Sequence, residues 1–256
     1  MTMQTEAQSY FDGVDLVTGS GERREGELCV MSLVALLAGE QHSDRPSTAC
    51  PVITAFVIRI NDAIDHPARQ DLKDYATRIM GTNDGRHHDR AWLLTRECVN
   101  DVFARMMEAK GANGDAIAAL PRMPLNADTS YDFKALSSEL QAAGRYFGLA
   151  RDLLKDMRYL LRAMREGRYE LVASAAAVLI VDCAHPLALN TDENVYWDKA
   201  IEMFSRLCAV GENDRVPATI NNDKMMVEIN RARAGSTMAP ILLWLFARLQ
   251  KPLKTD

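Results

Sequence analysis

The sequence predicts an all-α protein, a bundle of about eight to ten helices. A hydrophobic period of 3.6 recurs along most of the 256 residues, whereas the polar–apolar alternation typical of strands is nearly absent. Short Gly- or Pro-containing breaks separate the apolar segments, as expected between helices. The apolar fraction of 48% and the charged fraction of 25% are those of an ordinary globular chain.

A chain of this length can bury a substantial core and fits one domain. We expect residues 1–22, which contain three glycines, to be a loosely ordered segment, and residues 23–256 to form a single helical domain. Glycine, proline and asparagine are concentrated at 111–131. This region is either a boundary between two packed halves, 23–111 and 131–256, or a long functional loop.

Two strongly apolar segments, Leu28–Ala38 and Val52–Ile64, predict a buried helical hairpin. The second segment follows Pro51, which suits the first helical turn. Its predicted core stripe consists of Ile53, Phe56, Val57, Ile60 and Ile64. Pro67 ends this helix, because the residue before a proline is disfavoured in the α region. A third helix follows it to about Met80.

The helix after the Asp84-Gly85 turn carries one apolar face and stops at Gly111. From Phe133 to Met164, apolar residues recur at alternating spacings of three and four over about 30 residues. This heptad seam predicts one long helix or a tight helical hairpin, which bends or allows close approach at Gly144 and Gly148. The remaining helices are predicted at Tyr169–Ala184, 192–210, 221–234 and 238–250.

Composition limits the function classes. A net charge of −5 argues against indiscriminate nucleic-acid binding but permits a local basic face. The five cysteines lie mostly in apolar helical patterns, which favours buried free thiols in a reducing cytoplasm. Acidic residues stand where a secretion signal would be basic, and the longest uncharged runs are shorter than the about 20 residues that span a bilayer. We therefore expect a cytoplasmic protein without a membrane partner. It lacks the serine-hydrolase, P-loop and dinucleotide-binding motifs.

Glu40, His42 and Asp44 alternate along the polar loop between the two apolar segments. Carboxylates and imidazole are ligands for a divalent metal ion, and a carboxylate can orient an imidazole for acid–base chemistry. The competing interpretation is a capped turn, because no established metal spacing such as H-E-x-x-H is present. In a hairpin, Asp62 and Asp65 lie too far along the second helix to join this loop. A metal site in the 40–44 loop would therefore need ligands from another part of the chain.

The adjacent His88-Asp89 pair resembles the metal-binding pair of the all-helical HD phosphohydrolases. This resemblance implies a metal-dependent hydrolase of the phosphoester type. Further ligands would come from His42 or His66 upstream and from Asp152, Asp156 or Asp182 downstream. In that family the pair usually closes an apolar helical segment, whereas here a helix follows it. Asp89 therefore fits better in a first helical turn, where a carboxylate interacts favourably with the helix dipole.

A row of cations follows the heptad seam, displaced from it by one residue. It consists of Arg151, Lys155, Arg158, Arg162 and Arg165, and Arg145 and Arg168 extend it. Like charges at i, i+4 cost roughly a few tenths of a kcal/mol in an isolated helix, so such a row points to an anionic partner. The alternative is a solvated stripe that Asp152, Asp156, Glu166 or a neighbouring helix neutralises.

Two functions remain open, and the sequence does not decide whether the protein is an enzyme. The first is a soluble α-helical binding or regulatory protein that engages nucleic acid or an acidic protein through the basic 145–168 face. The second is the metal-dependent hydrolase, with its tentative ligands Glu40, His42, Asp44, His88 and Asp89. The longer basic pattern favours the first. The heptad seam is also compatible with a homo-oligomer.

Overall fold

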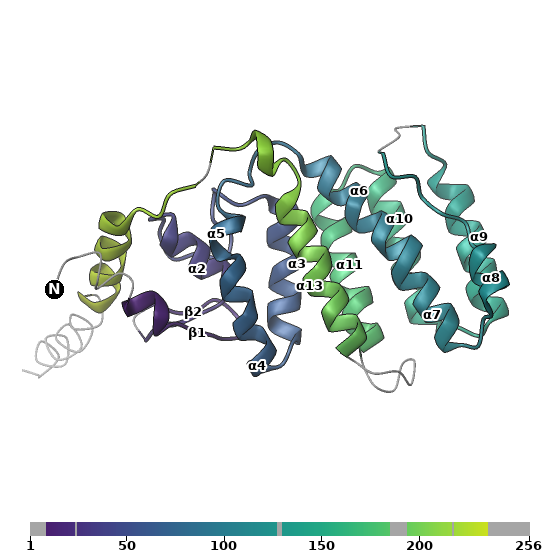
Figure 1. Cartoon of the computed structure of the whole chain (residues 1–256), viewed down its shortest axis with the longest axis horizontal. Coiled ribbons are helices and arrows are strands. Elements are labelled where there is room, and N and C mark those ends of the chain that lie inside the picture. The colour runs from purple at the N-terminus through teal and green to yellow at the C-terminus, as the bar shows by residue number, and fades with distance from the viewer. Residues whose placement is uncertain (1–8, 24, 127–129, 185–193, 217, 235–256) are drawn as a thin grey trace, which may run out of the picture.

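The computed structural model describes residues 9–23, 25–126, 130–184, 194–216 and 218–234. Of the residues that the structure describes, 68% are helical and 3% lie in strands, which confirms the all-α class. The helices stand side by side along one long axis (Figure 1). The helix predicted at 238–250 lies outside the described residues. None of the described helices has the length and apolar character needed to cross a membrane.

A small sheet opens the described chain. Residues 9–22, expected to be loosely ordered, form a short helix and two strands. The strands are β1 (Asp15–Leu16), β2 (Gly21–Glu22) and β3 (Glu27–Leu28), with β3 in the middle, parallel to β1 and antiparallel to β2. A Cβ at Gly21 would lie 2.2 Å from the Glu27 carbonyl oxygen, so glycine is required for this pairing. Two-residue strands are too short to show a period of two in the sequence.

The two predicted apolar helices are α2 (Val30–Leu37) and α3 (Pro51–Ala63), which pack against each other. Every residue of α2 is buried, and so are the five predicted core-stripe residues of the second segment. The predicted third helix is divided into three short pieces. They are α4 (His66–Arg69), the 3-10 helix η1 (Gln70–Tyr75) and α5 (Ala76–Ile79).

The helix predicted after Asp84-Gly85 begins at His87 and ends at Ala109, with a π-helical turn inside it. Its parts are α6 (His87–Glu97), η2 (Cys98–Val102) and α7 (Phe103–Ala109). The short helix α8 (Gly114–Ala118) follows. Gly111, the predicted stop, has a φ of +87°, the left-handed conformation that ends helices.

The heptad segment is divided into two helices, α9 (Phe133–Tyr146) and α10 (Arg151–Arg165), which pack against each other. Gly148 lies in the turn between them with a φ of +73°. A Cβ at Gly144 would lie 2.4 Å from Leu154 Cδ2, so this glycine permits the close approach. The seam residues Leu140, Met157 and Leu161 are buried within the single chain.

The central helix is α11 (Tyr169–Ala184), which contacts α3, α6, α10 and α13 (Asn194–Ala209). Several alanines on α11 are fully buried and allow these helices to approach closely. The 3-10 helix η3 (Glu212–Asp214) and a helical segment at 222–234 complete the described chain. One continuous hydrophobic core joins elements from both predicted halves.

Candidate functional site

The predicted basic row lies on the solvent side of α10, in the half of the molecule that also holds α7, α8 and α9 (Figure 1). The apolar stripe of α10 packs on α9 and α11, and the cations displaced by one residue therefore face outward. All five predicted partner-binding residues are exposed, namely Arg151, Lys155, Arg158, Arg162 and Arg165.

A groove of about 390 Å³ lies between α9 and α10. From α10 it is lined by Arg158, Leu161, Arg162 and Arg165. From α9 it is lined by Phe133, Lys134, Ser137 and Ser138. The hairpin thus adds Lys134 to the five cations of α10, together with two hydroxyl groups that the linear spacing of α10 does not reveal.

Glu166 partly neutralises this face. Its carboxylate accepts hydrogen bonds from Arg162 Nε at 2.8 Å and Arg168 Nη1 at 3.1 Å, and Arg165 Nη2 lies 3.7 Å away. The hydrogen bonds from Arg162 and then Arg168 lower the pKa of Glu166. One carboxylate therefore serves three guanidinium groups. Four cations of the face have no ion pair within the described part of the chain, namely Lys134, Arg151, Lys155 and Arg158.

Asp156, one of the acids expected to neutralise the row, is directed instead toward α11. Burial and then the neighbouring Asp182 carboxylate, with which it shares a hydrogen bond, raise the pKa of Asp156 to about 6. Two of the downstream acids considered for a metal site thus lie together across the α10–α11 interface. Because the two carboxylates repel each other when both are charged, Asp156 stays protonated to a higher pH. It therefore offsets the positive charge of the basic row only in part.

The 40–44 loop has a well-defined geometry. Glu40 accepts hydrogen bonds from the backbone N–H of Ser47 at 2.7 Å, the Ser47 hydroxyl at 2.9 Å and the backbone N–H of Thr48 at 3.1 Å. These bonds fit the interpretation of this loop as a capped turn. His42 lies beside Arg23, whose charge lowers the pKa of the imidazole after the larger effect of burial.

His88 and Asp89 lie in the first turn of α6. The His88 ring packs edge-on against Tyr169, with ring centroids 5.6 Å apart, and Asp89 lies 3.7 Å from Arg86. His66 pairs with Asp15 at 3.1 Å, at the other end of α3. Among the residues that the structure describes, no three His, Cys, Asp or Glu side chains are grouped so that they could hold a metal ion.

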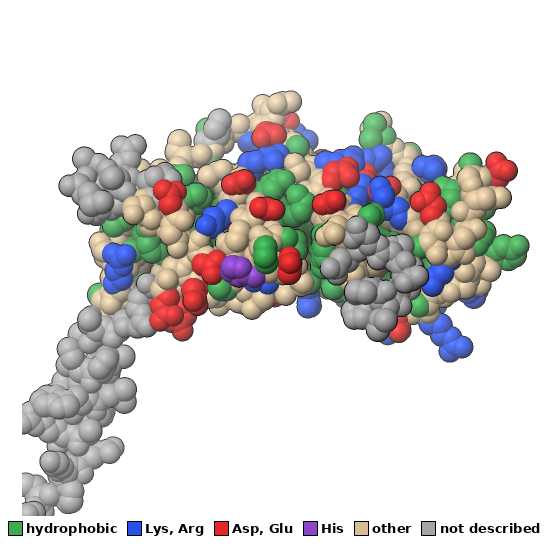
Figure 2. Space-filling view, turned by 60° about the horizontal axis from the view of Figure 1, so that its bottom comes forward, with side chains coloured by type: hydrophobic (Ala, Val, Ile, Leu, Met, Phe, Trp, Pro, Cys, Tyr) green, Lys and Arg blue, Asp and Glu red, His purple; other side chains and the backbone are tan. Residues whose placement is uncertain are grey.

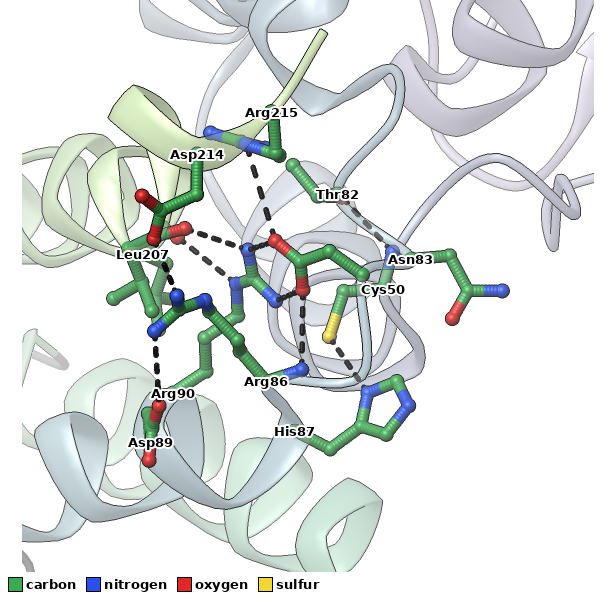
Figure 3. A network of polar contacts seen from close by, with 12 residues as sticks. Cys50, Thr82, Asn83, Arg86, His87, Asp89, Arg90, Leu207, Asp214 and Arg215 are labelled. Carbon is green, nitrogen blue, oxygen red and sulfur yellow. Dashed lines mark hydrogen bonds and ion pairs between the residues drawn. The ribbon is translucent and has the colours of Figure 1, made fainter.

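His87 takes part in a contact that the sequence did not indicate. Its Nδ1 lies 3.2 Å from the Sγ of Cys50, the residue that precedes α3 (Figure 3). His87 also lines a cavity of about 570 Å³ with Pro51 and Tyr169. The Cys50 side chain is completely buried, however, and is absent from the lining of that cavity. The contact between this thiol and His87 therefore links α3 to α6, and the thiol is not accessible to a ligand.

A buried ion pair beside this contact joins α6 to the C-terminal end of α13 (Figure 3). Arg90 donates to the two carboxylate oxygens of Asp84 at 2.6 and 2.8 Å and to the carbonyls of Leu207 and Val210. Burial raises the pKa of Asp84, but the bonds from Arg90 and the Arg86 backbone outweigh it and lower this pKa to about 2. Every carboxylate oxygen is engaged, so this network is structural.

No protein-family model matches the chain, and neither a curated protein nor a solved structure is significantly similar to it.

Proposed function

We propose that this protein binds nucleic acid, by its phosphate backbone, on the face formed by α9 and α10. We call it the α9–α10 face and define it by Lys134, Arg151, Lys155, Arg158, Arg162 and Arg165. The groove lined by Lys134, Ser137, Arg158 and Arg162 is the observation that carries the proposal. Its cations exceed the single carboxylate, Glu166, that pairs with them in the described chain.

The chemistry of the groove suits phosphate oxygens. The planar arginine fork donates two parallel hydrogen bonds to a phosphate, and serine hydroxyls are common phosphate donors. From Arg151 to Arg165 the row extends about 21 Å along the helix axis, which matches a polymer whose charges repeat regularly. Such contacts position a nucleic acid without reading its sequence.

An acidic protein is the competing partner. Protein interfaces take most of their binding energy from buried aromatic and apolar anchors. The exposed aromatic side chains of α9 and α10 are Tyr146 and Tyr159, at 84% and 44% exposure. Along the chain between them, the exposed residues include Arg151, Lys155 and Arg158 but no large apolar side chain. The balance therefore favours phosphate over an acidic protein surface.

The proposal predicts salt-dependent binding that charge reversal on α10 abolishes. We expect the Arg158→Glu, Arg162→Glu double variant to lose at least about tenfold in affinity for a labelled single-stranded or duplex oligonucleotide. Each single Arg→Ala change should reduce the slope of log K against log salt by about 0.7 for single strands and 0.9 for duplex. Fluorescence polarisation over a series of salt concentrations measures both quantities.

The matched control is the Arg59→Glu, Lys110→Glu double variant. It changes the net charge equally at two exposed cations that have no ion pair in the described chain and do not line the groove. Equal losses in both double variants, or binding that salt does not affect, would contradict the proposal. Binding to polyglutamate but to neither oligonucleotide would identify an acidic protein as the partner instead.

A further inference from the structure

A second cavity lies at the opposite end of the molecule from the α9–α10 face. It is open to solvent and is lined by β2, the polar loop after α2 and the helical segment 222–234, which lie together at one end in Figure 1. Its volume is about 560 Å³. The residues that line this cavity include Arg23, His42, Glu228 and Arg231.

Arg23 is the unusual residue of this cavity. Its side chain is 3% exposed, and its Nη1 donates to the Glu40 carbonyl and to Glu228 Oε2, each at 3.2 Å. Its Nε and Nη2 are also buried, but neither has a hydrogen-bond partner among the residues that the structure describes. Buried donors without acceptors are costly, and most such groups in native proteins are satisfied by protein, water or a bound group.

The two free nitrogens lie along one edge of the guanidinium plane. This edge is the fork that donates two parallel hydrogen bonds to the paired oxygens of a carboxylate or a phosphate. Glu228 does not fill it, because its carboxylate is bonded to Nη1 of Arg23 through Oε2 and to Arg231 through Oε1. Glu228 therefore holds both guanidinium groups in place beside the cavity.

The other groups at the cavity complete an anion-binding environment. Arg231 has an exposed side chain that adds a second positive charge. The pKa of His42 is lowered first by burial and then by Arg23, while the Gly21 carbonyl and Asp44 oppose this shift. An anion bound beside Arg23 would offset part of the repulsion between Arg23 and the protonated His42 and would so raise the pKa of His42. Glu22, whose side chain is exposed, also lines the cavity, and its carboxylate offsets part of this positive charge.

We infer that this cavity binds a small oxyanion, the carboxylate or phosphate group of a ligand, on the Nε–Nη2 edge of Arg23. Arg231 and His42 contribute charge and a donor at the cavity wall. This site is separate from the α9–α10 face, so the inference does not depend on the proposed function.

The test is an NMR titration of the histidine side chains with inorganic phosphate, acetate and, at matched ionic strength, chloride. We expect phosphate, acetate or both to shift the His42 signals saturably and to raise the pKa of His42, while chloride does neither. His66 provides an internal control, because it pairs with Asp15 outside the cavity. Phosphate bound only to the α9–α10 face would leave His42 unchanged, which separates the two sites.

The variants are Arg23→Met, Arg231→Met and, as a matched exposed control, Arg59→Met. We expect Arg23→Met to weaken the response of His42 at least tenfold and Arg231→Met to weaken it severalfold, with no change in Arg59→Met. If Arg23→Met fails to fold, as judged by circular dichroism, Arg231→Met still tests the site because its side chain is exposed. A response limited to phosphate or to acetate identifies the ligand group. Titrations indistinguishable from chloride, or unchanged in the folded variants, would show that water alone satisfies Arg23.

Discussion

Arg90 is completely buried, and Asp84 together with two backbone carbonyls occupies its donors. Arg23 is almost as buried, yet one edge of its guanidinium has no partner in the described part of the chain. Arg158 is exposed and has no ion pair within the described chain. The first therefore stabilises the fold, whereas the other two are the residues that we propose to bind anions. Residue type alone does not distinguish these roles, because the partners come from distant parts of the chain.

Asp156 and Asp182 supply a pH-dependent prediction at the same scale. Because the folded state raises the pKa of Asp156 from 3.8 to about 6, the protonated form is favoured and stability declines as the pH rises through this interval. We expect Asp156→Asn to remove this decline and to stabilise the protein at neutral pH by roughly 1 kcal/mol, after solvent screening of a half-buried pair. Urea unfolding at neutral pH and at about pH 4 measures the difference.

Asp198→Asn is the control for this prediction, because Asp198 is exposed on α13. The same gain in Asp198→Asn, or a gain for Asp156→Asn that is equal at both pH values, would contradict the assignment.

At the scale of the elements, two glycines determine how the α9–α10 hairpin is built. Gly148 ends α9 in the left-handed conformation, and Gly144 lets Leu154 of α10 approach the backbone of α9. The sequence pattern left open whether the heptad segment was one helix or two. The turn at Gly148 brings Lys134 and Ser137 opposite Arg158 and so creates the groove.

Substitution of Gly148 tests this turn. Apart from the two adjacent residues, no atom of the described chain lies within 4 Å of a Cβ built at this position, so the cost of a side chain there comes from the backbone conformation. We expect Gly148→Val to destabilise the protein by about 1–2 kcal/mol and Gly148→Asn by clearly less, because asparagine tolerates the left-handed region. Urea unfolding of both variants measures the difference. Equal stabilities for Val and Asn would show that residue 148 does not hold this conformation in solution.

At the scale of the whole molecule, α11 joins the two predicted halves by packing on α3 and α6 as well as on α10 and α13. The charges are distributed unevenly over this frame. On the face shown in Figure 2, acidic side chains gather beside a histidine, and lysines and arginines are interspersed with acids elsewhere. The net charge of −5 thus coexists with a row of exposed cations on the α9–α10 hairpin.

The shared core predicts that both halves unfold together. Trp92 on α6 and Trp197 on α13 contribute to the fluorescence, while far-UV circular dichroism follows all helices. We expect the urea transitions measured by the two methods to coincide, as in a two-state process. Two separated transitions would instead identify the halves as independently folding units.

The sequence by itself determined the all-α class, most helix positions and the outward direction of the five cations on α10. These properties follow from periodicity within one segment, where each residue's direction depends only on its near neighbours. The divided helix α4–η1–α5 and the two-residue strands were not predictable, since tertiary packing overrides weak local preferences.

Only the tertiary structure decided which polar groups meet. Arg23 and Glu228 are 205 positions apart, and Arg90 and Val210 are 120 apart. No local pattern encodes such pairings, because they depend on how whole helices pack. The Glu40–Asp44 loop shows the same difference between sequence and tertiary structure. Its sequence indicated a polar turn between buried helices. In the fold, Glu40 closes that turn through its hydrogen bonds to Ser47, and His42 lies beside Arg23.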